Sequence, residues 1–263
     1  MLVFTDLDGT LLNHHDYSFQ DAMQAINYLK NNAIPLIIVT SKTFSEVRVL
    51  QEQLGIECPF IVENGAGIFV HTNSILAKNL PHENRHIKIS SAKSYLELRL
   101  FFKTLQAKYS IKGFGDMQVD EVMHLTGLNF DAAHNAMQRD FTEPFIATGE
   151  IDIEAMQQEA NKEGLDIVKG GRFYHLISQG ADKAQAMQYL TDLFEKEFER
   201  SPKMIALGDS ANDFTMLKAA DIGILVQLHN GTFADIQSDN IIKTASAGPK
   251  GWNESLLEIL NVK

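Results

Sequence analysis

The chain has 263 residues, 44% of them hydrophobic, so it is long enough to bury a sizeable core in one large domain or two smaller ones. Its 23 basic and 34 acidic residues give a formal charge of -11 with no basic run, which argues against nucleic-acid binding, because such binding relies on Lys and Arg. A single cysteine, Cys58, excludes an intrachain disulfide, and without a cationic leader or a long apolar stretch we expect a cytoplasmic protein with no membrane contact.

Short apolar runs alternate with helical patterns in the first and last thirds of the chain. Strands are expected near Leu2, Leu36, Phe60, Met204 and Ile222. Helices are expected over residues 21–31, 45–54, 183–199 and 212–219. This alternation predicts an α/β fold with a doubly wound parallel sheet that is covered by helices on both faces.

The middle of the chain interrupts this alternation. One helical face is expected from Leu98, Phe101, Phe102 and Leu105, and extended segments over residues 141–146, 165–169 and 172–177. We therefore predict an inserted α+β cap over residues 83–179, and a catalytic core built from residues 1–82 and 180–263. Polar residues and glycines predict hinges over residues 79–84 and 178–182. Such a cap would exclude water and supply substrate contacts.

The first motif, Asp6-Leu7-Asp8-Gly9-Thr10, follows the first apolar run. Asp6 and Asp8 should therefore lie at the carboxyl end of a strand, where open α/β sheets bind ligands. Their spacing gives one carboxylate to attack phosphorus and a second to reach the leaving oxygen, while Gly9 allows a sharp bend. A calcium loop begins similarly, but it needs a Glu where this chain has Tyr17.

The second and third motifs centre on Thr40 and Lys183. Thr40 ends an apolar run, and a capping box from Thr43 to Glu46 should open the next helix, so that a hydroxyl and free amides suit a phosphate. Lys183 begins an amphipathic helix, where a cation opposes the macrodipole unless an anion such as phosphate, with Asp6 beside it, accompanies it. Taken singly, an ordinary turn hydroxyl and a solvated lysine remain open interpretations.

The fourth motif, Gly208-Asp209-Ser210-Ala211-Asn212-Asp213, follows another apolar run. Asp209 at the strand end can complete a carboxylate cage with Asp6 for a hard octahedral cation such as Mg²⁺. Asp213 can orient a ligand from behind that cage. Taken alone, the motif also fits an ordinary capped helix, because Ser, Asn and Asp are all favoured at helix starts.

With these four motifs in order, the chain resembles the haloacid dehalogenase superfamily of phosphatases, in the branch that carries a cap between the second and third motifs. The resemblance sharpens to the mannosyl-3-phosphoglycerate phosphatase family. It rests on residues 39–43, 63–66, 170–176, 208–213 and 248–252. One departure is Ser41-Lys42, where many sugar phosphatases carry Gly-Arg, and it favours the phosphoglycerate branch.

The resemblance implies the reaction and the roles of the motif residues. Asp6 would be the nucleophile and a metal ligand, Asp8 the general acid and base and a ligand through its backbone carbonyl, and Asp209 the third ligand. The phosphate would be held by Thr40, Lys183 and Asn212. The expected activity is Mg²⁺-dependent hydrolysis of mannosyl-3-phosphoglycerate, a small phosphorylated sugar acid, through an aspartyl phosphate.

Other functions remain open. The substrate could be the glucosyl epimer, and the enzyme could be a broad-specificity sugar phosphatase or a phosphomutase of the same superfamily. A receiver-like signalling module also uses a phosphoacceptor Asp, a Thr or Ser and a Lys on a parallel sheet. The inserted cap and a second carboxylate in the first motif, that of Asp8, argue against that module, since signalling does not need rapid hydrolysis. Oligomeric state is not predicted.

Substrate contacts are expected from the cap and the facing loops. Arg172 is the candidate for the glycerate carboxylate, with a surface salt bridge as the alternative. Asn64 either orients sugar hydroxyls or forms, with Gly65, the type I′ turn of a hairpin. Lys42 is a further candidate without an assigned contact. His175 fits a structural role better than a catalytic one, and Trp252 either packs the C-terminal segment or contacts ligand.

Overall fold

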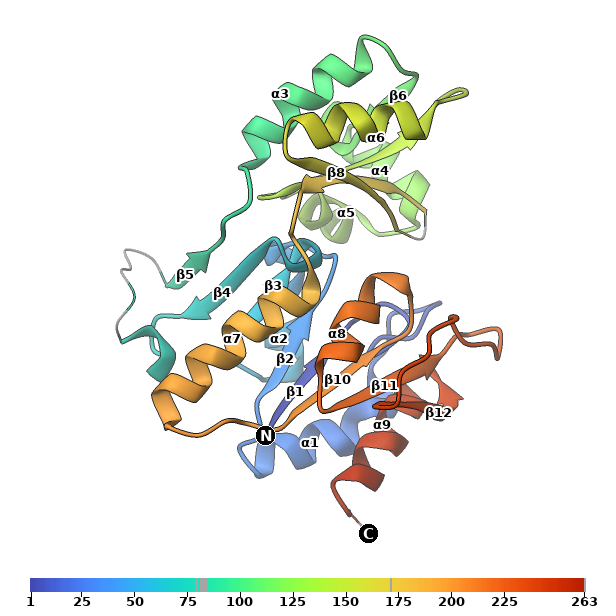
Figure 1. Cartoon of the computed structure of the whole chain (residues 1–263). Coiled ribbons are helices and arrows are strands. Elements are labelled where there is room, and N and C mark those ends of the chain that lie inside the picture. Colours follow the sequence, from blue (N-terminus) through green and yellow to red (C-terminus); the bar gives the residue numbers. More distant parts are fainter. Residues whose placement is uncertain (79, 81–84, 171, 263) are drawn as a thin grey trace.

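Two β-sheets organise the protein, one above the other in Figure 1. The computed structural model describes residues 1–78, 80, 85–170 and 172–262. Most of the hinge expected over residues 79–84, and Gly171 of the sequence stretch 170–176, lie outside this part of the chain. No helix among the described residues combines the length and apolarity needed to cross a membrane.

The larger sheet has eight strands in the order β12-β11-β10-β1-β2-β3-β4-β5. In chain order these are β1 (Leu2–Thr5), β2 (Leu36–Val39), β3 (Phe60–Val62), β4 (Gly67–His71), β5 (His86–Ile89), β10 (Met204–Gly208), β11 (Ile222–Gln227) and β12 (Ile241–Ala247). Strands β12 to β3 are parallel, and β4 and β5 extend the sheet antiparallel. Strand β5 belongs to this sheet although it follows residue 83, where the predicted cap begins.

Helices cover both faces of the larger sheet, as predicted. The first face carries α1 (Met23–Asn31), α2 (Phe44–Leu54) and α9 (Gly248–Ile259), and the second carries α7 (Lys183–Phe198) and α8 (Phe214–Ala219). Side chains of a strand alternate between these two layers. In β1, Val3 packs with the first group while Leu2 and Phe4 pack with the second, all at most 2% exposed. The doubly wound α/β class is confirmed.

The smaller sheet is antiparallel, in the order β6-β7-β9-β8. Its strands are β6 (Ile111–Gly113), β7 (Thr142–Ala147), β8 (Leu165–Lys169) and β9 (Tyr174–Ser178). Its helices are α3 (Tyr95–Gln106), α4 (Val119–Thr126), α5 (Phe130–Ala136) and α6 (Ile153–Lys162). Helices α3 and α6 bury one face of the sheet, whereas α5 lies on the side of the larger sheet (Figure 1).

Candidate active site

Three predicted site residues follow adjacent parallel strands. Asp6 comes directly after β1, Thr40 after β2 and Asp209 after β10, and β1 lies between the other two strands. Because parallel strands end at the same edge of a sheet, the three residues are brought together although they are far apart in the sequence. Lys183 joins them from the first turn of α7, whose N-cap is Asp182.

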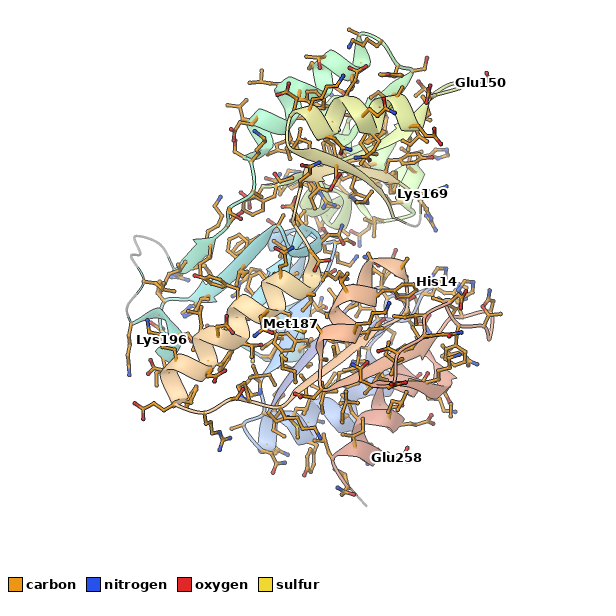
Figure 2. The ribbon with its side chains drawn as sticks, in the orientation of Figure 1. His14, Glu150, Lys169, Met187, Lys196 and Glu258 are labelled. Carbon is orange, nitrogen blue, oxygen red and sulfur yellow. The ribbon has the colours of Figure 1, made fainter. Side chains whose placement is uncertain are left out.

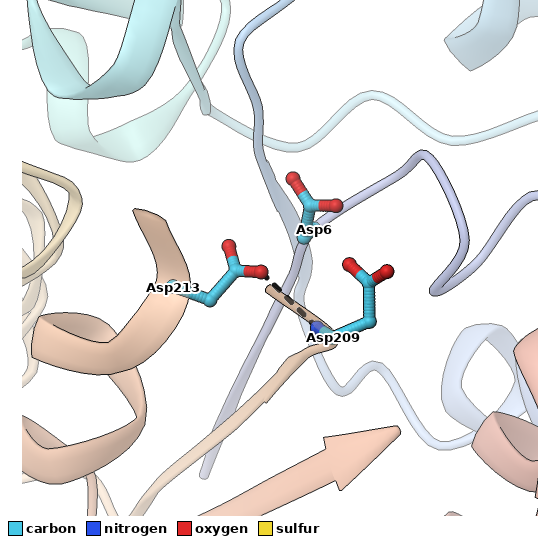
Figure 3. A group of neighbouring side chains, drawn as sticks. All are labelled: Asp6, Asp209 and Asp213. Atoms are coloured by element: carbon cyan, nitrogen blue, oxygen red, sulfur yellow. Dashed lines mark hydrogen bonds between the residues drawn. The ribbon is translucent and has the colours of Figure 1, made fainter. Parts of the chain in front are cut away.

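The centre of the site is a buried cluster of three carboxylates and one ammonium group. Oxygens of Asp6, Asp209 and Asp213 all lie within 4.8 Å of one another, and Figure 3 shows the three side chains gathered at one point. Lys183, only 1% exposed, places Nζ 2.6 Å from Asp6 Oδ1 and 2.6 Å from Asp213 Oδ1. The expected proximity of Lys183 and Asp6 is present, whereas its contact with Asp213 was not anticipated.

One lysine does not balance this much buried negative charge. Burial raises the pKa of Asp6, the attraction of Lys183 lowers it, and the neighbouring Asp213 and Asp209 raise it further, with a net upward shift. Burial and repulsion from Asp213 raise the pKa of Asp209 to about 7. A bound cation would relieve this repulsion, and carboxylate oxygens are the donors that Mg²⁺ prefers. The residues at this point therefore fit a divalent metal.

Asp213 holds the loop after β10 in place. Its Oδ1 is occupied by Lys183, while its Oδ2 accepts hydrogen bonds from the backbone N–H groups of Asp209 and Ser210, both at 3.1 Å. Figure 3 draws the bond to Asp209 as a dashed line. With both oxygens engaged, Asp213 is arranged to orient Asp209 and Lys183.

The turn after β1 closes around Asp209. Gly9 has φ +80°, and a Cβ atom at this position would lie 2.6 Å from Asp209 Oδ2. Both the backbone conformation and this close contact disfavour any residue with a side chain. Thr10 donates a hydrogen bond from Oγ1 to Asp209 Oδ1 at 3.3 Å. Thr10 was not among the predicted site residues, although it is the last residue of the first motif and thus carried a signal.

Lys42 has a contact that its sequence did not reveal. Its Nζ lies 3.0 Å from Asp8 Oδ1 and 3.6 Å from Glu46 Oε1. Although burial disfavours the charged form, Asp8 and Glu46 raise the pKa of Lys42. The residue that replaces the usual Arg therefore stays cationic and holds the second aspartate of the first motif.

Thr40 is fully buried beneath the loop that follows it. Its Oγ1 accepts a hydrogen bond from the backbone N–H of Lys42 at 3.2 Å, and it is not among the residues lining the cavity described below. The capping box predicted from Thr43 to Glu46 is confirmed, with both reciprocal hydrogen bonds present at the start of α2.

A cavity of about 550 Å³ lies between the two sheets and opens onto the carboxylates. From the larger sheet's side it is lined by Asp6, Asp8, Lys42, Asn64, Asp209 and Asn212, among others. From the smaller sheet's side it is lined by Arg139, Pro144, Lys169, Arg172, Phe173 and His175, among others. Figure 2 shows Lys169 and His14, also a lining residue, at the facing edges of the two parts. The cationic side chains on the smaller sheet's side face the carboxylates on the larger sheet's side. Such a lining suits an anionic substrate.

Two predicted substrate contacts have partners within the protein. Arg172 donates from Nη1 to the carbonyl oxygens of Thr126 at 2.9 Å and Leu125 at 3.3 Å, at the end of α4, and no salt bridge involves it among the described residues. Asn64 accepts a hydrogen bond from Asn212 Nδ2 at 3.1 Å. The hairpin of β3 and β4 is present, and Asn64 and Gly65 have the positive φ values expected of a type I′ turn, +59° and +95°, with the Ala66 N–H donating to the Glu63 carbonyl at 3.3 Å.

The structure separates the roles of His175 and Trp252. His175, on β9, lines the cavity, and its Nδ1 is buried without a hydrogen-bond partner among the described residues. Burial and the nearby Arg139 lower the pKa of His175 to about 3, so the ring is neutral. Trp252 is fully buried and donates from Nε1 to Thr5 Oγ1 at 2.9 Å, which answers the open question in favour of packing.

Relatives of known name match the chain over its whole length. A phosphatase from Persephonella marina named glucosyl-3-phosphoglycerate/mannosyl-3-phosphoglycerate phosphatase is 49% identical, over 99% of this chain and 97% of the relative. A protein of the same name from Methanococcoides burtonii is 36% identical, over 98% of this chain and 97% of its own length.

Solved structures share the fold at lower identity. A Thermoplasma acidophilum protein superposes with a TM-score of 0.70 at 17% identity, covering 100% of this chain and 98% of that one. A sucrose-phosphatase from Synechocystis, solved with sucrose and phosphate, gives a TM-score of 0.62 at 17% identity, covering 98% and 97%. The profile of the haloacid dehalogenase-like hydrolases matches residues 3–246. With its motif residues gathered at one sheet edge, the chain belongs to the haloacid dehalogenase-like hydrolases.

Proposed function

We propose that the chain is a Mg²⁺-dependent phosphatase that hydrolyses mannosyl-3-phosphoglycerate, and its glucosyl counterpart, to the glycosylglycerate and phosphate. The observation that carries the proposal is the buried contact of Asp6 with Lys183, beside Asp209, at the floor of a cavity with cationic walls. The substrate follows from relatives that match the full length and bear this name.

The reaction uses Asp6 and Asp8 in two half-reactions. An Asp6 carboxylate oxygen attacks phosphorus in line, the bond from phosphorus to the glycerate oxygen breaks, and protonated Asp8 gives its proton to that oxygen. Asp8, now ionised, takes a proton from a water molecule that attacks the aspartyl phosphate and releases phosphate. Lys183 offsets the repulsion between Asp6 and the incoming phosphate dianion.

Asp6, Asp209 and the backbone carbonyl of Asp8 would hold the magnesium ion. When bound, the ion supplies positive charge that stabilises the transferring phosphoryl group. Asp213 keeps Asp209 turned toward that position through the Asp209 N–H. Asn212, on the cavity wall, contacts the phosphate directly. Thr40, buried at the end of β2, supports the phosphate site from below.

The smaller sheet and its helices act as the cap. We place this inserted unit at residues 90–179, since β5 ends at Ile89 in the larger sheet and β9 ends at Ser178 in the smaller one. Arg172 binds the glycerate carboxylate through its Nε and Nη2 edge, because Nη1 already serves the carbonyls of α4. Lys42 and Asn64 complete the substrate contacts from the core.

Phosphate release by the purified protein, with and without Mg²⁺, tests this function. The panel comprises mannosyl-3-phosphoglycerate, glucosyl-3-phosphoglycerate, 3-phosphoglycerate and common hexose phosphates. We expect Mg²⁺-dependent release with the glycosyl-3-phosphoglycerates preferred. Even activity across the hexose phosphates would instead indicate a broad sugar phosphatase, and no release from any compound would refute the proposal.

A further inference from the structure

A buried carboxylate joins the two parts of the protein beside the chain segments that connect them. Glu63 lies in the loop after β3 of the larger sheet and is fully buried. Its Oε1 accepts a hydrogen bond from the N–H of Asp140 at 2.8 Å. Its Oε2 accepts from the N–H of Phe141 at 3.1 Å and from Thr142 Oγ1 at 2.6 Å. All three donors belong to the inserted unit, at the start of β7.

The backbone of the same loop is bound to the catalytic edge of the larger sheet. The Glu63 N–H donates to the carbonyl of Lys42 at 3.0 Å, and the Asn64 N–H donates to the carbonyl of Thr40 at 2.9 Å. Glu63 also has φ +51°, an uncommon conformation for a residue with a side chain. The backbone of Glu63 is therefore bound to the loop after β2, whereas its side chain is bound to the inserted unit.

Further contacts surround this junction. Arg139 of the inserted unit donates from Nη1 to the carbonyl of Ser41 at 2.9 Å, and Thr43 of the core donates from Oγ1 to the carbonyl of Asn135 at 2.9 Å. The Phe141 ring packs so tightly on Gly67 that a Cβ there would lie 2.3 Å from it. The junction is thus polar at its centre and tightly packed at its side.

The hydrogen bonds of Glu63 make this attachment hard to release. Burial raises the pKa of Glu63 and outweighs Arg139 and the three donors, which lower it. Pulling the inserted unit away would remove every hydrogen bond to the side chain, because all described donors lie on that unit. A motion of the inserted unit that preserves this contact is therefore favoured over one that breaks it.

We infer that Glu63 is a positioning residue, the fixed pivot about which the inserted unit turns over the active site. This inference rests on the proposed role of that unit as a cap. With the pivot intact, Arg172 and His175 approach the carboxylates in one orientation. Without it, the connecting segments and the surrounding contacts of Arg139, Thr43 and Phe141 hold the cap less firmly, and substrate groups held by the cap lose contacts. The phosphate, held by the core, keeps its own.

The test compares two substrates in four proteins. We would measure kcat and KM on mannosyl-3-phosphoglycerate and on p-nitrophenyl phosphate for the wild type, Glu63→Ala, Thr142→Val and Lys88→Ala. Lys88→Ala is the matched control, because it removes a half-exposed ion pair to Asp140 at the same junction, 3.0 Å long. Thr142→Val removes a single donor to Glu63 and covers the case in which Glu63→Ala does not fold.

For Glu63→Ala we expect KM for the glycosyl substrate to rise at least tenfold, with kcat/KM for the aryl phosphate within threefold of wild type. Thr142→Val should shift the glycosyl KM in the same direction by a few fold, and Lys88→Ala should change neither substrate by more than twofold. Equal losses on both substrates, or an unchanged glycosyl KM in both Glu63→Ala and Thr142→Val, would overturn the pivot.

Small-angle X-ray scattering separates failure of the pivot from failure of the proposed function. If the wild type does not act on the glycosyl substrate, the proposed function fails, but the pivot still predicts a larger radius of gyration for Glu63→Ala than for Lys88→Ala. Identical scattering from the wild type, Glu63→Ala and Thr142→Val would count against the pivot whatever the substrate.

Discussion

Lys183 and Asp6 are 177 positions apart in the chain, yet Lys183 Nζ lies 2.6 Å from Asp6 Oδ1 in a fully buried contact. The contact joins the first turn of α7 to the end of β1, across the second face of the sheet. It also places the cation beside the group proposed to attack phosphorus.

Asp6→Asn should abolish turnover while the protein stays folded. The amide keeps the size of the side chain but is not a nucleophile, and it removes one of three crowded carboxylates. We expect phosphate release to fall at least about a thousandfold, with a melting temperature no lower than that of the wild type. Asp235→Asn, at an exposed position, is the control. Substantial release by Asp6→Asn would remove Asp6 from its proposed role.

Lys183→Met should destabilise the protein strongly when divalent cations are absent. Removing the ammonium group leaves Asp6 and Asp213 buried without their common partner, a loss that typically costs about 3–5 kcal/mol. Added Mg²⁺ should recover part of the loss, because the ion supplies positive charge at the same carboxylates. Urea unfolding with and without Mg²⁺ measures both effects.

Lys196→Met, on the same helix but exposed, is the matched control for this variant and should change stability by less than about 1 kcal/mol. An equal loss in the two variants would mean that the helix rather than the ion pair is being weakened. No recovery on adding Mg²⁺ would argue against a cation at the carboxylates.

The parallel strands and their site residues were predictable because each core strand is a short apolar run followed by polar residues. Strands near Leu2, Leu36, Phe60, Met204 and Ile222 are all confirmed. Strand β12 was missed, because it is an edge strand in which only Thr244 is buried and its sequence carries no apolar run. Helix α9 was missed as well, since it opens with Gly-Pro-Lys-Gly.

Contacts between distant segments were harder to predict than the residues themselves. Lys42 and Arg172 were predicted as substrate contacts, but no residue of the protein was predicted to contact either of them. Lys42 meets Asp8 only because β1 and β2 are neighbours, and Arg172 meets the carbonyls of α4 only because that helix ends beside it. Likewise His175 fitted a structural role in isolation, and the sheet places it on the cavity wall.

The folded protein should lose stability in acid partly through His175. Burial and Arg139 hold its pKa at about 3, whereas an unfolded histidine titrates near 6.5. Between these values the unfolded chain binds more protons, so the free energy of unfolding falls as the pH is lowered from about 6.5 toward 3. One such group contributes at most about 1.4 kcal/mol per pH unit.

His175→Gln should therefore show a shallower pH dependence than the wild type in urea unfolding followed by circular dichroism between pH 6.5 and 4. His124→Gln, at an exposed position, serves as the control and should keep the wild-type slope. If His175→Gln and the wild type have the same slope, the imidazole is not held neutral in the folded state.

Trp252 should support Asp6, the proposed nucleophile, through a two-step chain of hydrogen bonds. Its Nε1 donates to Thr5 Oγ1 at 2.9 Å, and that hydroxyl donates to the carbonyl of Asp6 at 2.7 Å. Trp252→Phe removes the first donor and leaves space in a fully buried position, so we expect a loss of about 1–2 kcal/mol in the free energy of unfolding. Turnover should fall only a few fold, since the second hydrogen bond remains.

A double-mutant cycle with Thr5→Val separates the hydrogen bond from the lost packing. Valine keeps the shape of Thr5 without the hydroxyl, so once it is present Trp252→Phe can remove only packing. We expect the two losses in stability to be non-additive by about 0.5–1.5 kcal/mol, the usual net contribution of one hydrogen bond. Strict additivity would assign the whole effect of Trp252 to packing of α9 against β1. The hydrogen bond from the indole would then not help to position Asp6.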